Sequence, residues 1–246
     1  MLSDSDISKY LGKYIGIYPI IEKNFEGSCI ELTASELAWS LSTKQRVAHD
    51  GHITIPKHDS VLIITQETVY LDKRFAGYCI SKVSMPSFGI VSTSAPVKPN
   101  WIGKLLITVH NVSNNDYILE VGKEFAILTI HKLRNKSKKI PPRPNARTDL
   151  LSRHGIQLSA QDLDILNSQA DGDPRILFKL IKRDPVYKEF RINTMFGQHL
   201  VQICIYALVF GTIYVIFKEL LGVTFIESVL SGIISTFIYE KIKNRR

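Results

Sequence analysis

The chain has 246 residues, of which 45% are hydrophobic, enough for one well-buried globular domain with smaller elements beside it. Its formal net charge of +8 would suit a protein that binds nucleic acid. The basic residues gather near the apolar C-terminal segments, however, so we expect the chain to contact a membrane surface and not nucleic acid. Cys29, Cys79 and Cys204 have no metal-ligand or redox spacing, so we expect no metal and no cofactor.

The first predicted element is a short helix from Leu2 to Leu11. Ser3 can cap this helix, and Asp4 and Asp6 lie in its first turn, where acidic side chains interact favourably with the helix dipole. We expect no secretory signal here, because the segment from Met1 to Tyr10 is polar and acidic.

Short β-rich runs separated by turn residues follow, up to Leu133. Asn114–Asp116 and Gly122–Lys123 are typical turn sequences. Short strands at regular spacing predict a mainly β domain over residues 1–133, built as a barrel, jelly roll or sandwich. The predicted runs are Tyr14–Ile21, His52–Ile55, Ser60–Thr65, Phe75–Val83, Leu105–Val109, Tyr117–Val121 and Phe125–Leu133.

Proline and basic residues then replace the β pattern. Residues 134–148 are predicted to form an extended linker, because proline pairs disfavour both helix and sheet. Residues 149–198 are predicted to form short helices that couple the β domain to a membrane segment. Ser159 to Asp162 resembles a capping box, and Pro174 can open a helix with apolar residues at helical spacing.

Two long apolar runs predict a transmembrane hairpin over residues 199–239. They extend from His199 to Phe217 and from Leu220 to Tyr239, each close to the ~20 residues that span a bilayer core. Basic residues precede the first run and occur in the tail, residues 240–246. The positive-inside rule then predicts a multi-pass inner-membrane protein with its N-terminal domain and C-terminus in the cytoplasm.

The second apolar run carries a carboxylate and a stripe of small residues. Glu227 is costly in hydrocarbon, so we expect it near the interface, neutral, or directed at another helix or a lumen. The small residues permit close helix packing, either within the hairpin or around a pore. They are Ser228, Ser231, Gly232 and Ser235.

Within the β-rich region, an ordered set of motifs resembles the dCTP deaminases, members of the trimeric dUTPase-like superfamily. The opening, Met1–Ile7, resembles their MLSDxDI start, and Ser28–Leu32 resembles their S-x-D-L strand. Ser81–Gly89 is similar to the phosphate-binding segment, and Ala95–Gly103 is similar, with a short deletion, to the A-x-x-I-D-P-G hairpin. The resemblance implies a dUTPase-like fold, a homotrimer or higher homo-oligomer, and a pyrimidine nucleotide as ligand.

Several departures from that pattern predict a loss of catalysis. Thr108 stands where the resemblance places the deaminase glutamate, and a hydroxyl has no carboxylate basicity for proton transfer. Lys98 stands where the dUTPases have the aspartate that activates water. Ile127 and Ser87 replace a glutamine and a phosphate-binding arginine. We therefore predict no catalytic residues and no enzyme activity.

The resemblance still implies a ligand pocket. In it, Lys82 and Ser84 would hold phosphate oxygens, Lys98 would add a positive contact, and Trp101 would stack beneath the sugar. The alternative is that Trp101 is a packed hairpin aromatic and that both lysines are solvated surface charges. The predicted ligand-binding residues are Lys82, Ser84, Lys98, Asn100, Trp101 and Thr108.

Three functions remain open from the sequence. The first is a ligand-gated membrane effector, since the layout resembles the transmembrane effectors of Pycsar antiphage systems; cUMP or cCMP would bind, and membrane lipid would be the second partner. The second is a membrane-tethered dCTP deaminase or dUTPase, which needs a carboxylate near Thr108 or Lys98, with Glu31 and Glu120 as candidates. The third is a constitutive membrane scaffold or holin-like protein that needs no ligand.

Overall fold

The computed structural model describes residues 1–138, 145–166, 172–190 and 204–213. The chain divides into two compact units, Met1–Ile192 and Asn193–Arg246. In the second unit, residues 204–213 are helical.

The strands and named helices all belong to the first unit. The strands are β1 (Ile15–Tyr18), β2 (Phe25–Glu26), β3 (Cys29–Ser40), β4 (Ala48–His49), β5 (His52–Ile55), β6 (Ser60–Leu71), β7 (Phe75–Ser81), β8 (Ile90–Ser92), β9 (Ala95–Val97), β10 (Ile102–Asn111), β11 (Tyr117–Glu120) and β12 (Glu124–Lys132). The helices are α1 (Asp4–Tyr10), α2 (Thr148–Arg153), α3 (Ala160–Leu166) and α4 (Pro174–Arg183), with short 3-10 turns η1 (Glu22–Asn24), η2 (Pro86–Phe88) and η3 (Asn145–Arg147).

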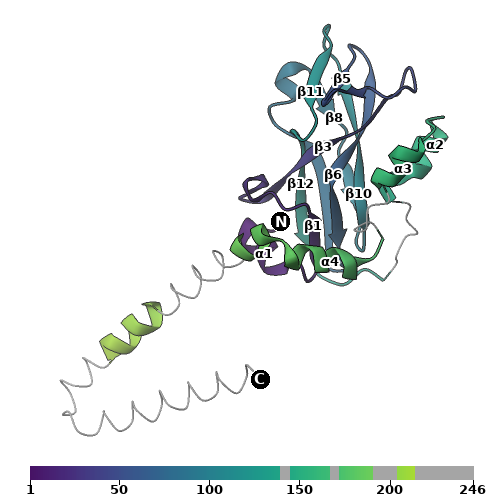
Figure 1. The fold of residues 1–246 in the computed structure, drawn as a ribbon. Helices are drawn as coiled ribbons and strands as arrows, with labels where there is room; N and C mark the ends of the chain where they lie inside the picture. Colours follow the sequence, from purple (N-terminus) through teal and green to yellow (C-terminus); the bar gives the residue numbers. More distant parts are fainter. Residues whose placement is uncertain (139–144, 167–171, 191–203, 214–246) are drawn as a thin grey trace, which may run out of the picture. The chain divides into compact units, whose positions relative to one another are not determined.

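In the described part of the chain, nine strands form one sheet, ordered β8-β10-β6-β3-β12-β7-β9, with β1 beside β6 and β2 beside β3. Strands β11, β5 and β4 form a second, three-stranded sheet at one end of the long strands (Figure 1). Neighbouring named strands run antiparallel. The prediction of a mainly β fold followed by short helices is therefore confirmed for this part.

The first helix forms as its capping pattern predicts. Ser3 Oγ accepts from the backbone N–H of Asp6 at 3.2 Å, and the Asp6 carboxylate accepts from the Ser3 backbone N–H at 3.3 Å. This reciprocal pair satisfies two N–H groups that a helix start leaves unbonded.

Strand β6 is longer than the predicted run that ended at Thr65, and both of its faces are covered. Val61 and Ile63 belong to the main core, whereas Leu62 and Ile64 belong to a second apolar cluster on the opposite face. All four are at most 4% exposed. Fully burying one such side chain contributes ~1.5–3 kcal/mol, so β6 is stabilised from two sides.

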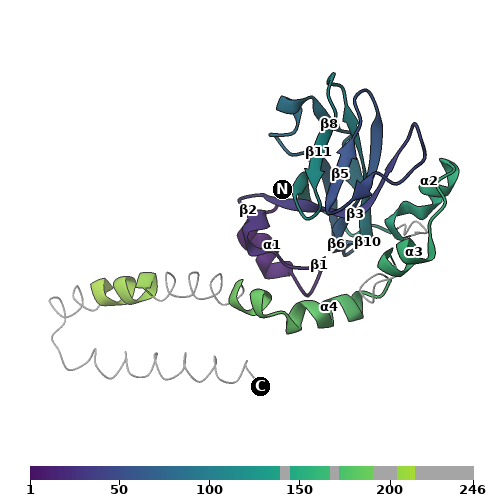
Figure 2. The same cartoon turned by 45° about the horizontal axis from the view of Figure 1, so that its top comes forward.

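The cover on the second face comes from η3, α2 and α3, which lie against β6 and β10 in both views (Figures 1 and 2). Ala146 and Leu151 are fully buried there. Asp162 of α3 adds an ion pair with Arg46, at 3.0 Å. The structure thus differs from the extended linker expected over 134–148, because its last residues pack against the sheet with Ala146 buried. Residues 139–144 of that linker lie outside the described residues.

Helix α4 packs against β1. The side chain of Leu177 lies so close to Gly16 that a Cβ there would come within 2.6 Å of it. The rings of Phe178 and Tyr70 meet edge-to-face at 5.4 Å. Residues expected to be a coupling region are therefore part of the same packed unit as the strands, because their apolar faces are buried on it.

The predicted capping box at Ser159 is present, with the Asp162 backbone N–H donating to Ser159 Oγ at 3.1 Å and the Ser159 N–H donating to the Asp162 carboxylate at 2.9 Å. Pro174 opens α4 as predicted.

Most of the predicted hairpin, including Glu227, Ser228, Ser231, Gly232 and Ser235, lies outside the described residues, as does the tail 240–246. Within the described ranges, no helix has both the length and the apolar character needed to cross a membrane.

Candidate functional site

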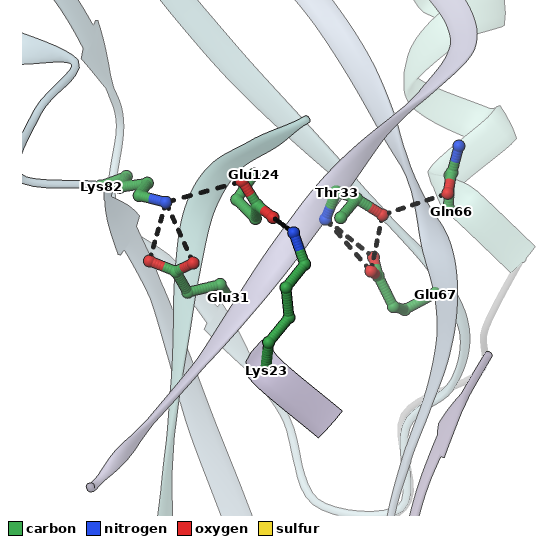
Figure 3. Close-up of polar contacts among 7 residues, drawn as sticks. All are labelled: Lys23, Glu31, Thr33, Gln66, Glu67, Lys82 and Glu124. Carbon is green, nitrogen blue, oxygen red and sulfur yellow. Dashed lines mark hydrogen bonds and ion pairs between the residues drawn. The ribbon is translucent and has the colours of Figure 1, made fainter. Parts of the chain in front are cut away.

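Lys82 lies at the centre of a charged cluster at the end of β7 (Figure 3). Both carboxylate oxygens of Glu31, on β3, lie 2.9 Å from Lys82 Nζ. Glu124, at the start of β12, places a further oxygen 3.7 Å from the same nitrogen. The Lys82 backbone N–H donates to the carbonyl of Phe125 at 3.4 Å, which keeps the lysine beside β12.

Glu124 has a second cationic partner, Lys23 of η1. Lys23 Nζ donates to the Glu124 carboxylate at 2.8 Å. This hydrogen bond is the main reason that the pKa of Glu124 is lowered and that the pKa of Lys23 is raised. The Glu124 side chain is only 9% exposed, whereas that of Lys23 is 73% exposed. Lys23 therefore approaches a sheltered carboxylate from solvent.

On the other side of β3 lies a carboxyl group that the sequence analysis missed, Glu67 of β6 (Figure 3). Its carboxylate accepts from the Thr33 backbone N–H at 3.0 and 3.1 Å and from Thr33 Oγ1 at 2.6 Å. Glu67 is 2% exposed, and burial raises its pKa, against the opposing effect of these hydrogen bonds. The available signal was a glutamate in the polar stretch Thr65–Thr68, which interrupts two apolar runs, Val61–Ile64 and Val69–Leu71.

Irregular pairing surrounds Thr33. The register of β3 with β6 shifts between Ala34 and Ala38, and that of β12 with β3 shifts between Glu124 and Ala126. The register of β10 with β6 shifts as well, just after Lys104. β-Bulges bend a strand and re-aim its side chains, so the residues around Thr33 depart from the regular alternation of a sheet.

Lys98, Asn100 and Trp101 form the turn between β9 and β10. The Trp101 backbone N–H donates to the Lys98 carbonyl at 3.2 Å, and Asn100 has a φ of +61° in the tight turn. Indole Nε1 of Trp101 donates to the Gly103 carbonyl at 3.1 Å, and its half-buried ring packs against the core. Lys98 is exposed. The N–H edge of the Trp101 indole is thus used in a hydrogen bond within the turn.

Thr108 is half-buried on β10, opposite Leu62 of β6. Leu62 belongs to the apolar cluster that α2 and α3 cover, so Thr108 lies on that face of the sheet. Two residues along β10, the ring of His110 lies between two hydroxyl groups, with Nδ1 2.7 Å from Ser60 Oγ and Nε2 2.9 Å from Thr93 Oγ1. Thr108 thus pairs with an apolar residue and lies two residues from an imidazole held between two hydroxyl groups.

Within one chain, the six predicted ligand contacts fall into two separate groups. Val97 pairs with Gly77 of β7, and the chain from there runs away from Lys82. Gly77 and Lys82 are ~16 Å apart along the strand at ~3.3 Å per residue, so the Lys98–Trp101 turn lies at the far end of β7.

Thr108, in contrast, is linked to the Lys82 end. Ser92 of β8 contacts Ser81 through their hydroxyl groups at 2.8 Å, and the next residue, Thr93, donates its backbone N–H to the Thr108 carbonyl at 3.3 Å. Ser84 is exposed and its carbonyl accepts from Ser87 Oγ at 2.6 Å. These contacts connect the Lys82 end of β7 with the backbone of Thr108 through β8, while the Thr108 side chain lies on the face of Leu62.

Known proteins resemble this β domain. A dCTP deaminase of Thermococcus gammatolerans is 29% identical over 127 residues, which is 52% of this chain and 81% of the relative. A dCTP deaminase of Pyrococcus horikoshii is 28% identical over 131 residues, 53% of this chain and 81% of the relative. Among solved structures, the 2'-deoxycytidine 5'-triphosphate deaminase from Agrobacterium tumefaciens matches 52% of this chain and 47% of its own, with 10% identity and a TM-score of 0.45.

A family model described as dCTP deaminase-like matches residues 1–133, which is more than half of the sequence and includes every strand from β1 to β12. Through these residues the chain belongs to the dCTP deaminase-like family.

Proposed function

We propose that the β domain binds a pyrimidine nucleotide without converting it, and that binding controls a membrane-active C-terminal segment. The observation that carries this proposal is the environment of Thr108, which the motif resemblance equates with the deaminase glutamate. Its cross-strand partner is Leu62, and its neighbour His110 is held between two hydroxyl groups. A hydroxyl of ordinary acidity in such surroundings cannot cycle a proton at neutral pH as a carboxylate does.

The two separated groups of contacts support a binding site shared between copies of the chain. Lys82, Ser84 and Thr108 would come from one subunit, and Lys98, Asn100 and Trp101 from another. The ~16 Å between Gly77 and Lys82 makes it difficult for one small ligand to meet both groups within a single chain. A homotrimer or higher homo-oligomer would bring the two groups together.

We propose that the ligand is a cyclic pyrimidine mononucleotide, cUMP or cCMP, as in the Pycsar effectors that the domain arrangement of this chain resembles. Binding would reorganise the apolar segments after residue 198 and impair inner-membrane integrity. The packing of α4 on β1 supports a mechanical connection, because it extends the packed unit to the residues just before those segments.

The test uses the purified full chain in lipid nanodiscs. Calorimetry should detect binding of cUMP or cCMP, while product analysis with dCTP and dUTP should show no deamination or hydrolysis above the uncatalysed rate. A Thr108→Glu variant introduces a carboxylate, and Thr108→Gln, of the same size but uncharged, is its matched control. Enzymatic turnover of dCTP or dUTP by the wild type would refute the proposal.

A second candidate is a membrane-tethered dCTP deaminase or dUTPase, and the names of the two relatives, both dCTP deaminases, support its deaminase form. It predicts turnover in the same assay and no leakage of dye from vesicles when nucleotide is added. The effector predicts ligand-dependent leakage, reduced in Glu227→Gln or Ser231→Leu variants.

A further inference from the structure

Lys82, the cation that the proposed site would offer to a phosphate, is already engaged within the chain. Its ammonium has both oxygens of Glu31 at 2.9 Å and one oxygen of Glu124 at 3.7 Å. Only a quarter of the Lys82 side chain is exposed. The ammonium that the resemblance assigns to phosphate binding is therefore already paired with carboxylates (Figure 3).

Adjacent elements hold this arrangement in place. Glu31 and Glu124 lie on the paired strands β3 and β12, and Lys23 occupies the second carboxylate oxygen of Glu124 at 2.8 Å. Two lysines and two glutamates give the cluster no net charge. The carboxylates are sheltered, with side-chain exposures of 19% for Glu31 and 9% for Glu124, so solvent screens their repulsion of an incoming anion poorly.

We propose that Glu31 masks Lys82 against polyphosphates and so restricts the site to nucleosides or nucleotides with at most one negative charge. A triphosphate could reach the ammonium only by displacing Glu31, which would leave a sheltered carboxylate unpaired beside several phosphate charges. A phosphodiester carries one charge and meets much less repulsion. This inference rests on the proposed function and makes Glu31 the specificity-determining residue of the site.

The experiment is calorimetry of the full chain with tripolyphosphate, dUTP and cUMP. Glu31→Gln removes the masking charge, and Glu26→Gln, at an exposed position on the adjacent strand β2, makes the same change in net charge. We expect Glu31→Gln to bind tripolyphosphate and dUTP at least about tenfold more tightly than the wild type, because a charge-assisted contact is released. The affinity for cUMP should change much less, and Glu26→Gln should match the wild type.

Adding Lys82→Met to Glu31→Gln should abolish the gain, since Lys82 is the cation released. A gain that survives Lys82→Met overturns the proposal, and so does a Glu31→Gln variant that binds tripolyphosphate no better than the wild type. Thermal unfolding verifies that each variant folds, and Glu31→Ala provides a second unmasking variant. A tripolyphosphate gain without nucleotide binding in any variant would support masking while refuting nucleotide sensing.

Discussion

Glu124 and Glu67 lie on the two strands that flank β3, and their carboxyl groups are perturbed in opposite directions. The ammonium of Lys23 lowers the pKa of Glu124, whereas burial raises that of Glu67. Thr33 lies between them, paired in register with Glu124 and bonded to Glu67. A charged partner determines the direction of the pKa shift at Glu124, whereas at Glu67 the hydrogen bonds only moderate the effect of burial.

The largest expected effect comes from removing the buried carboxyl group. Glu67→Ala leaves the Thr33 N–H without its acceptor, leaves the Thr33 hydroxyl with only Gln66 Oε1 at 3.2 Å, and opens a void. We therefore expect a loss of about 2–4 kcal/mol of unfolding free energy. Urea denaturation measures it. Glu67→Gln retains an acceptor oxygen and should lose less than half as much. Equal losses in both variants would mean that the hydrogen bonds to Thr33 contribute nothing.

The pH dependence of stability should separate the two carboxyl groups. In the unfolded chain the pKa of Glu67 is near 4.5, and folding raises it. The protonated carboxyl group therefore favours the folded state below pH 4.5, and this stability is lost as the pH rises through the folded pKa. Glu67→Gln should therefore gain stability relative to the wild type as pH rises above about 4.5, by about 1.4 kcal/mol per unit of raised pKa. Denaturation curves across this pH range provide the measurement.

Glu124→Gln should show the opposite behaviour. The lowered pKa of Glu124 contributes stability above the unfolded value near 4.5, which is lost as pH falls through the folded pKa. The deficit of Glu124→Gln relative to the wild type should thus be full at neutral pH and shrink on acidification. If the stability of Glu67→Gln and of Glu124→Gln relative to the wild type changed in the same direction with pH, the two carboxyl groups would not be perturbed in opposite directions.

The smallest effect is expected for Lys23→Met. Because the lysine is exposed and its ion pair is screened by solvent, the substitution should change stability only slightly. The pKa of Glu124 should nevertheless rise towards its ordinary value, measured by NMR titration of the carboxyl carbon. Glu22→Gln, a change at an exposed neighbour in η1, is the matched control and should leave that pKa unchanged.

Local patterns predicted the parts of the fold that depend on neighbouring residues. The cap at Ser3, the strand His52–Ile55 and the proline start of α4 form as predicted, because capping, alternation and a proline N1 are short-range effects. The run Val61–Ile64 lacks polar alternation, which indicates a strand covered on both faces. That signal was available and implied that something must cover the second face.

The candidate site was less predictable because it depends on pairing between distant strands. Lys82 and Glu31 are 51 residues apart, and Glu67 and Thr33 are 34 apart. The pairing of β3 with β6 brings Thr33 and Glu67 together, and the pairing of β12 with both β3 and β7 brings Glu31 and Lys82 together. The motif at Lys82 identified a cation, but its engagement by Glu31 became visible only in the folded chain.

The docking of residues 145–166 against the sheet determines where the protein can be divided. A fragment that ends at residue 133 would match the family boundary yet leave Trp39, Leu62 and Ile64 facing water. Such a fragment would be prone to self-association through this uncovered surface. Recombinant versions intended for crystallisation should therefore retain the chain beyond α4 to Ile192, because Tyr187 and Phe190 are buried in the main core.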